Sequence, residues 1–256
     1  MRSVPNALEQ LLLPAECLLC RGLLSFADAD RMVCPVCRHR WRPVLPPWCE
    51  RCGQPEPLFG GCRLCADWPA ALRRVRSAVW LEGGAREAVH ALKYAGRARL
   101  ADDLAAAMSG AMLRGWDDAV LVPVPLGPAR LRQRGYNQSE RLAQALGRRW
   151  KRSVVDLLVR VRDTGTQTAL TPAARRANVA GAFETRNVER GTRNGRPGEC
   201  SAFRVPSSAL EQPLILVDDV FTTGATLAEA AWALERAGAR AVLAVTFGRA
   251  VLPDFS

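Results

Sequence analysis

The sequence contains very little lysine and no long hydrophobic run. Lys93 and Lys151 are its only lysines although the formal net charge is +11, so arginine supplies nearly all of the positive charge. Because no stretch of about 18 uncharged apolar residues occurs, we expect no transmembrane helix. The chain also lacks a leading basic segment followed by an apolar core and a cleavage site. We therefore expect no signal peptide and a cytoplasmic location.

A concentrated basic run is also missing. The arginines are spread along all 256 residues. A basic surface attracts nucleic acid or a polyphosphate, but an arginine- and alanine-rich composition produces the same charge without such a partner. The charge is therefore only a weak indication of nucleic-acid binding. The hydrophobic content of 48% supports one large domain, or one domain with a small module.

The cysteines, in contrast, follow a regular pattern. Eight of the nine form four Cys-x-x-Cys pairs, and the ninth, Cys200, is expected to be an unpaired thiol. Each pair can present two thiolates to one ion, and four thiolates complete a tetrahedral Zn²⁺ site. The sequence between the pairs is too short to bury a core, so metal must supply the folding energy. We predict two structural zinc sites formed by Cys17, Cys20, Cys34, Cys37, Cys49, Cys52, Cys62 and Cys65.

Two pairings of these knuckles are possible. Neighbouring pairs would give two successive ribbons, whereas a crossed arrangement would join the first pair to the third; we favour neighbours. His39 could be a spare ligand, but eight thiolates already fill two sites. Trp41 and Trp48 are expected to pack between the ribbons, with stacking on a nucleobase as the alternative.

A second regular stretch lies near the C-terminus. The apolar run 214–217 follows Pro213 and predicts a buried strand of a parallel sheet that ends at Asp218 and Asp219. A threonine- and glycine-rich loop and a helix to Arg236 come next. The N-terminus of such a helix attracts anions, threonine hydroxyls add donors, and glycine permits close approach of a phosphate. The loop consists of Thr222, Thr223, Gly224, Ala225 and Thr226.

The two carboxylates cannot hold phosphate, because like charges repel. They suit sugar hydroxyls beside the phosphate, or a hydrated Mg²⁺. A capped helix after a core strand would explain a single acid and a single threonine. Two acids, three threonines and a glycine in this order favour a phosphorylated sugar as the ligand.

The remaining chain predicts alternating strands and helices. We expect Lys93, at a helix end, to contact a phosphate oxygen or to interact with the helix dipole. Arg134 lies in a basic loop whose guanidinium groups can fork onto pyrophosphate, and Asn137 can cap the next helix. Strands are predicted over 75–81, 119–125, 154–160, 181–183 and 241–247, helices over 85–92, 100–113, 138–150 and 173–179, loops over 126–140 and 163–168, and a linker over 66–72.

The stretch from Leu214 to Thr226 resembles the 5-phosphoribosyl 1-pyrophosphate (PRPP) binding signature of type I phosphoribosyltransferases. Almost the whole chain is similar to the ComF family, a competence-associated group with an N-terminal double zinc ribbon. The motifs that carry the resemblance are Leu92-Lys93-Tyr94, 122–125, 134–138, 164–170 with Gln167 central, 176–178 before 181–183, and 218–226.

The resemblance implies an α/β protein with the parallel-sheet type I phosphoribosyltransferase fold and a small double zinc-ribbon module. The ribbons would occupy residues 1–70 and the phosphoribosyltransferase-like domain residues 71–256. A disordered insertion is expected at about 186–212, where Gly, Arg, Pro, Ser and Asn are frequent.

The same resemblance implies roles for the site residues. Asp218 and Asp219 would be catalytic and hold the ribose hydroxyls, while the loop 222–226 would hold the 5-phosphate. Lys93 or Arg134 would contact pyrophosphate and Mg²⁺, and the loop around Gln167 would close over the site. The implied chemistry is loss of pyrophosphate from the anomeric carbon and attack there by the nitrogen of an amine or a base. The sequence does not identify this acceptor.

A non-catalytic role is the alternative. The pocket would then sense a nucleotide or strand end, and the ribbons would contact a DNA-uptake helicase or single-stranded DNA. The family's association with natural transformation and use of external DNA favours this hypothesis. A weaker third possibility is an amidotransferase-like role that uses ammonia.

Overall fold

The structure, a computed structural model, describes residues 14–55, 62–94, 96–111, 116, 118–162, 177–186, 188–189, 205–206 and 208–251. The strands are β1 Leu72–Trp80, β2 Val120–Pro123, β3 Leu158–Arg160, β4 Phe183–Thr185, β5 Val188–Glu189, β6 Val205–Pro206, β7 Leu214–Phe221 and β8 Val242–Arg249. The helices are α2 Pro35–His39, α3 Gly83–Tyr94, α4 Ala101–Met108, α5 Pro128–Arg134, α6 Gln138–Trp150, α8 Ser208–Glu211 and α9 Ala225–Arg236, with 3₁₀ turns Phe26–Asp28, Ala98–Leu100 and Ser109–Ala111.

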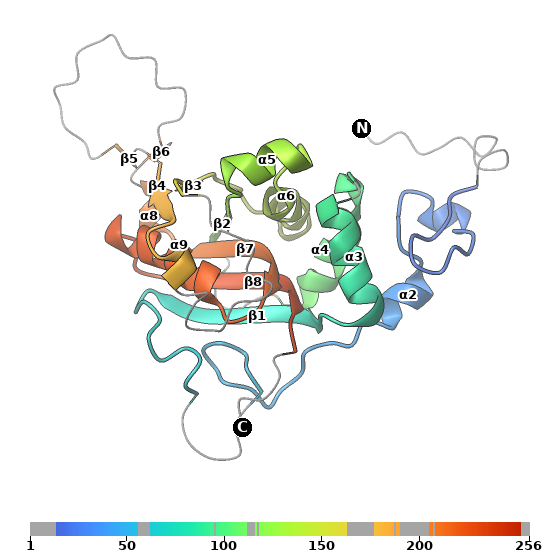
Figure 1. Cartoon of the computed structure of the whole chain (residues 1–256), viewed down its shortest axis with the longest axis horizontal. Helices are drawn as coiled ribbons and strands as arrows, with labels where there is room; N and C mark the ends of the chain where they lie inside the picture. Colours follow the sequence, from blue (N-terminus) through green and yellow to red (C-terminus); the bar gives the residue numbers. More distant parts are fainter. Residues whose placement is uncertain are drawn as a thin grey trace, which may run out of the picture.

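A parallel sheet forms the centre of the molecule (Figure 1). Its strand order is β1-β8-β7-β2, and all three pairings are parallel. The central strands β7 and β8 are buried along nearly their whole length. This burial explains their continuous apolar sequences, because both faces of a parallel sheet are covered. The predicted fold class is thereby confirmed.

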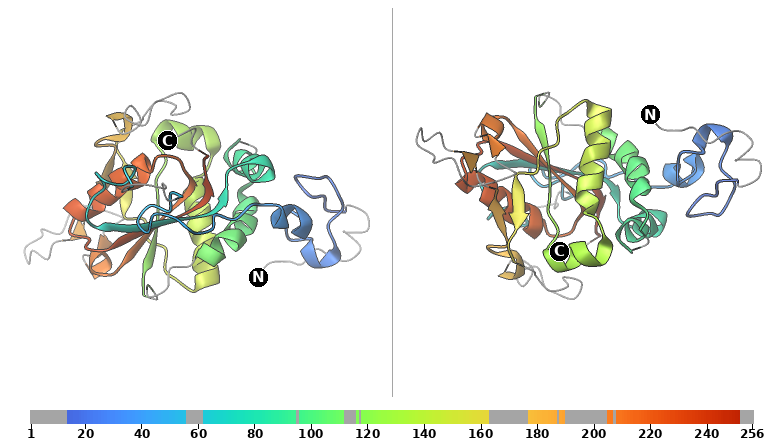
Figure 2. Two further views of the ribbon diagram at one scale, coloured as in Figure 1. Left: turned by 90° about the horizontal axis from the view of Figure 1, so that it is seen from below. Right: turned by 90° about the horizontal axis from the view of Figure 1, so that it is seen from above.

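Alternate residues of β7 separate the two layers of the core. Leu214 and Leu216 pack with α9 and with the four cysteines between residues 49 and 65. Ile215 and Val217 pack on the opposite face with α3, α4 and α6. Figure 2 shows this division of the helices in two further views. In the parts of the chain that the structure describes, no helix is long and apolar enough to cross a bilayer.

Residues 38–48, which connect the two ribbons, cover the free edge of strand β1. The amide of Val44 donates to the carbonyl of Ala78 at 3.1 Å, and Trp80 donates to Arg42 at 2.8 Å. An uncovered edge strand would leave its backbone N–H and C=O groups available for pairing with another chain. Pro43 is compatible with the outer position of this segment, because proline cannot donate a backbone hydrogen bond to a further strand. The segment therefore covers the free edge of β1.

Buried charged groups attach both ribbons to the sheet domain. Asp103 of α4 accepts hydrogen bonds from the amides of Met32 at 2.8 Å and Val33 at 3.2 Å in the first ribbon, residues 17–37. Arg249 of β8 donates to the carbonyl of Cys52 at 2.9 Å in the second ribbon, residues 49–65. Trp41 packs edge-on against Phe247 at 5.0 Å between ring centroids. Because Trp41 is buried there, stacking of its ring on a nucleobase is excluded.

Several predicted elements differ from the structure. The loop 126–140 contains helix α5, and the range 66–72 is packed against the core, with Trp68 and Ala71 buried. Strand β7 continues through the two acids to Phe221, and Gly83 begins α3. In the range 66–72 and in β7, the backbone follows packing between distant segments and not local sequence preference.

The boundary at residue 70 stays a prediction. Each ribbon shares a core with the sheet. In the expected insertion, the described residues form β5, β6 and α8, and Ala209 and Leu210 of α8 are buried. The rest of that insertion, including Cys200, lies outside the described residues. The loop 163–168 and the start of the helix expected over 173–179 also lie outside them.

Candidate ribose-phosphate pocket and zinc sites

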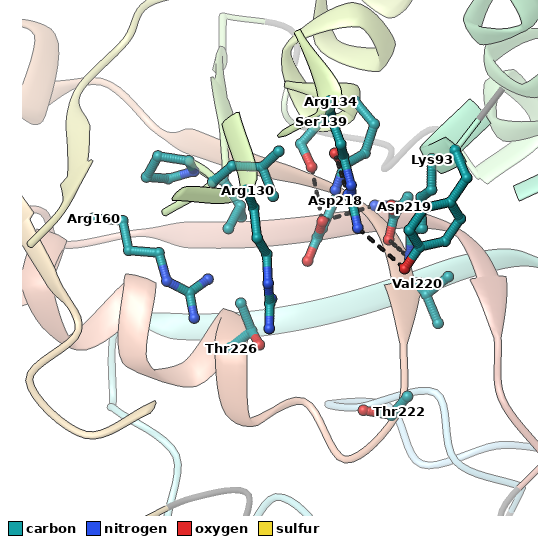
Figure 3. A pocket seen from close by; sticks show the side chains of 15 residues that line it. Lys93, Arg130, Arg134, Ser139, Arg160, Asp218, Asp219, Val220, Thr222 and Thr226 are labelled. Carbon is teal, nitrogen blue, oxygen red and sulfur yellow. Dashed lines mark hydrogen bonds and ion pairs between the residues drawn. The ribbon is translucent and has the colours of Figure 1, made fainter. Parts of the chain in front are cut away.

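A pocket opens where two neighbouring strands end at different levels. Strand β2 stops at Pro123, opposite Val217, whereas β7 continues to Phe221. Ligands of open α/β sheets bind in crevices at the carboxyl ends of the strands, which is where this pocket lies. Its volume is about 320 Å³. The polar side chains lining it are Lys93, Tyr94, Arg130, Arg134, Gln138, Ser139, Arg160, Asp218, Asp219, Thr222 and Thr226 (Figure 3).

Asp218 lies at the base of the pocket and is 9% exposed. Its Oδ1 accepts hydrogen bonds from the Ser139 hydroxyl at 2.8 Å and from the Asp219 amide at 2.9 Å. Burial, and then the neighbouring Asp219 carboxylate, raise the pKa of Asp218 to about 7, although these hydrogen bonds oppose the shift. The carboxyl group can therefore change its charge near neutral pH.

The capped start of α6 positions Ser139. The Asn137 side chain accepts a hydrogen bond from the Ser139 amide at 3.1 Å and donates one to the carbonyl of Val124 at 3.1 Å. The predicted cap is thus confirmed, and it also fixes the loop that follows β2. No sequence motif identified Ser139, because its role depends on contact with Asp218, 79 positions away.

Asp219 has one partnered and one unpartnered oxygen. Its Oδ1 lies 3.0 Å from the Lys93 ammonium, which projects from the C-terminal end of α3. Its Oδ2 is buried and has no hydrogen-bond partner within the described part of the chain. Buried carboxylate oxygens normally accept hydrogen bonds, so this atom fits a ligand hydroxyl or a hydrated cation.

The threonine loop has two faces. Thr222 and Thr226 line the pocket, whereas Thr223 and Ala225 line a separate cavity. Gly224 has φ +77°, and a Cβ added there would lie 2.4 Å from the Trp68 ring. The nearby Trp68 ring therefore accounts for the glycine at this position, a reason different from the expected close approach of a phosphate.

Basic side chains surround the acids. The Arg134 guanidinium lies 5.0 Å from the Tyr94 ring centroid, and Arg134 donates to Gln138 Oε1 at 2.9 Å. Arg160 lies 5.1 Å from the ring centroid of Phe183 and reaches the pocket from β3. The sequence did not identify Arg160 as a pocket residue. Its position depends on the pairing of β3 with β4, a strand more than 20 positions away in the sequence. Gln167 lies outside the described residues.

Neighbouring knuckles form the two cysteine clusters. Within each cluster all four Sγ atoms lie within 4.8 Å of one another, the first being Cys17, Cys20, Cys34 and Cys37 and the second Cys49, Cys52, Cys62 and Cys65. Sγ–Sγ distances of 3.8, 3.8 and 3.5 Å occur in them. A tetrahedral zinc ion with Zn–S bonds of about 2.3 Å requires about 3.8 Å, so the donors fit zinc.

The pairing of neighbours is confirmed, and the crossed alternative is wrong. Backbone amides support the thiolates of the first cluster: Cys34 donates to the Sγ of Cys17 at 3.3 Å, and Cys37 donates to the Sγ of Cys34 at 3.4 Å. His39 is exposed and belongs to neither cluster, as expected.

The parallel sheet, its crevice with paired acids and the two four-cysteine sites define a zinc-ribbon α/β protein. The family model of the double zinc ribbon domain matches residues 8–68. The chain is 31% identical over 242 residues to DNA utilization protein YhgH of Salmonella typhi, covering 91% of this chain and 96% of that protein. It is 27% identical over 239 residues to competence protein ComFC of Bacillus subtilis, with coverage of 87% and 89%. The chain belongs to the ComF family, which includes these relatives.

Proposed function

We propose that this protein binds PRPP, or a related ribose 5-phosphate ligand, together with Mg²⁺, and acts in DNA uptake and the use of external DNA. The observation that carries the proposal is the buried Asp218–Asp219 pair with its unpartnered Asp219 Oδ2. The names of the relatives, competence protein and DNA utilization protein, support the cellular role. In this proposal, residues 1–70 are the ribbon module and 71–256 the ligand-binding domain.

The pocket offers each part of such a ligand a suitable partner. Asp218 and Asp219 would accept hydrogen bonds from the ribose hydroxyls, and hydroxyl groups of Thr222 and Thr226 at the start of α9 would donate to the 5-phosphate. Lys93, whose ammonium lies 3.0 Å from Asp219 in the lining of the pocket, would contact the pyrophosphate group. When bound, Mg²⁺ supplies positive charge that neutralises the phosphate oxygens.

Arginine provides additional charge for a polyphosphate. Arg130, Arg134 and Arg160 all line the pocket, and guanidinium groups bind phosphate oxygens in a forked geometry. Four basic side chains beside two acids suit a ligand that carries several negative charges and also exposes hydroxyl groups. The role of Gln167 in closing the site stays a prediction.

Calorimetry tests this proposal directly. The full chain, titrated with PRPP and Mg²⁺, should bind one equivalent, while Asp219→Asn should bind at least about tenfold more weakly, because it removes one charged acceptor. Asp118→Asn, a change at an exposed carboxylate, is the matched control and should bind as the unmodified chain does. Absence of binding by the unmodified chain, with a known phosphoribosyltransferase binding in parallel, would refute the proposal.

A second candidate function is a non-catalytic adaptor for single-stranded DNA. The net charge of +11 and the DNA utilization relatives favour it. Release of pyrophosphate in the presence of an amine or a nucleobase would support phosphoribosyl transfer. Salt-dependent binding of single-stranded DNA, with no turnover of PRPP, would support the adaptor.

A further inference from the structure

A second cavity lies behind the threonine loop. Its volume is about 320 Å³, and it is bounded by the second ribbon, residues 177–180 and helix α9. Among the described residues, none lines both this cavity and the ribose-phosphate pocket. Thr222 and Thr226 face the first pocket, while Thr223 and Ala225 face the second. The loop therefore presents two different sets of groups on its two sides.

Thr223 gives this cavity an unsatisfied hydrogen-bonding group. The residue is 4% exposed, and its Oγ1 is buried without a partner in the described structure. Leaving a buried hydroxyl unpaired costs about 1–3 kcal/mol, whereas valine has the same shape and no hydroxyl group. A hydroxyl in this position is explained by a ligand that pairs with it.

The other walls indicate the chemical class of that ligand. Trp68 and Trp232 provide aromatic surfaces, and Trp232 is 39% exposed although most of its helix, α9, is buried. A cavity of this size accommodates a small organic molecule. Aromatic walls favour a planar ring, because flat π systems stack on each other.

The charged side chains that line the cavity in the described part of the chain are both acidic, which disfavours an anion. Asp67 and Glu229 line it, and no lysine or arginine does so among the described residues. Glu229 already accepts a hydrogen bond from the Gly181 amide at 2.9 Å and lies 3.8 Å from Arg236. Asp67 can therefore act as an acceptor for an amino group of a neutral or cationic ligand, and a phosphate would be repelled.

We propose that this cavity is a second binding site for a neutral or cationic planar heterocycle of the size of one nucleobase. Its ring stacks on Trp232, the Thr223 hydroxyl donates to a ring acceptor, and the Asp67 carboxylate accepts from an amino group. The assignment is independent of the ligand of the first pocket, because the two sites share a loop but no lining residue.

Ligand-observed NMR with the full chain tests the assignment, with adenine and cytosine as probes and cyclohexylamine as a non-planar control. At least one base should bind saturably, and Thr223→Val and Trp232→Ala should each weaken it by about tenfold. Thr222→Val, whose side chain faces the other pocket, should leave base binding unchanged. Ribose 5-phosphate should not displace the base.

The variants also separate this proposal from a general loss of structure. The melting temperatures of the three variants show whether any of them is unfolded. Because Trp232 is partly exposed, Trp232→Ala still tests the proposal if Thr223→Val is unstable. The proposal fails if neither base binds, if cyclohexylamine binds equally well, or if both Thr223→Val and Trp232→Ala bind like the unmodified chain. It also fails if Thr222→Val abolishes base binding. Binding of PRPP is measured separately, so failure of one proposal does not imply failure of the other.

Discussion

At the scale of the residue, Asp218 combines a place in the proposed ligand site with a cost in stability. Its pKa, raised to about 7 from 3.8 by burial and by Asp219, means that the folded chain holds a proton more tightly than the unfolded chain does. The free energy of unfolding therefore falls as the pH rises through this window. A buried charge near a second acid is retained where ligand binding requires it.

We expect Asp218→Asn to be more stable than the unmodified chain at pH 8, by about 1–3 kcal/mol, because it removes a buried charge. Below about pH 3 the difference should disappear, since Asp218 is then mostly neutral in both the folded and the unfolded chain. Urea denaturation at both pH values measures this. Equal stability of Asp218→Asn and the unmodified chain at pH 8 would show that the buried Asp218 carboxylate does not destabilise the fold.

Gly224 is constrained by both its backbone and its neighbour. Gly224→Ala should destabilise the fold, because alanine is strained at φ +77° and its Cβ would meet Trp68 at 2.4 Å. Gly135→Ala is the matched control: its φ is +76°, and nothing lies within 4 Å of the added atom. Strain alone costs about 1–2 kcal/mol, and the clash should add about 1–3 kcal/mol. Equal losses in thermal or urea unfolding would contradict the role of Trp68.

The sequence identified the acids of the site better than their partners. Asp218 and Asp219 stand beside a recognisable strand and loop, so a short motif is sufficient to find them. Ser139 and Arg160 reach the same pocket from other elements, and only the three-dimensional arrangement brings them there. Thr223 belongs to the recognised loop, but only the structure shows that it lines the separate cavity while Thr222 and Thr226 line the pocket.

At the scale of the element, the hydrophobic pattern of the sequence predicted helices whose apolar faces are buried in the structure. Helix α6 spans the predicted range 138–150, because its cap and its apolar face agree. Helix α5 was missed, because it buries none of its residues and has no apolar stripe; Pro128 at its start fixes the first turn. The acids fall inside β7 and not after it, because β7 remains paired with β8 beyond the end of β2.

Asp103 is expected to determine how the first ribbon attaches to α4. Asp103→Ala leaves the amides of Met32 and Val33 without their acceptor and removes a partner of Arg31 and Arg38. The cost should be about 3 kcal/mol, and hydrogen exchange in the first ribbon should accelerate. Asp103→Asn keeps one acceptor oxygen and should lose less. Unchanged exchange in Asp103→Ala would show that other contacts hold the ribbon.

At the scale of the whole molecule, the two ribbons occupy different faces of the sheet. The first lies beside α3 and α4 (Figure 1). The second shares a core with α9, and Trp68, which follows its last cysteine, lies against Gly224 of the threonine loop. Arg51 reinforces the second attachment by donating to four backbone carbonyls between Cys65 and Leu72. Cysteine spacing predicted both ribbons, but no local pattern showed where each would dock.

Loss of the second zinc should therefore affect the ribose-phosphate pocket. The purified chain should contain two zinc ions, and Cys49→Ser should lose one together with affinity for PRPP, because Trp68 no longer supports Gly224. Cys17→Ser, the matched change in the first ribbon, should lose the other zinc and retain most of the affinity. Metal analysis and calorimetry measure both. Equal loss of affinity in the two variants would contradict this coupling.

The measurement that tests the central claim most directly is NMR titration of the full chain with PRPP and Mg²⁺, followed through the threonine methyl groups. The account predicts that Thr222 and Thr226 shift together with saturation at one equivalent, because they contact the phosphate, while Thr223 on the far side of the loop shifts less. Saturable shifts confined to other regions, or no shifts at all, would contradict it.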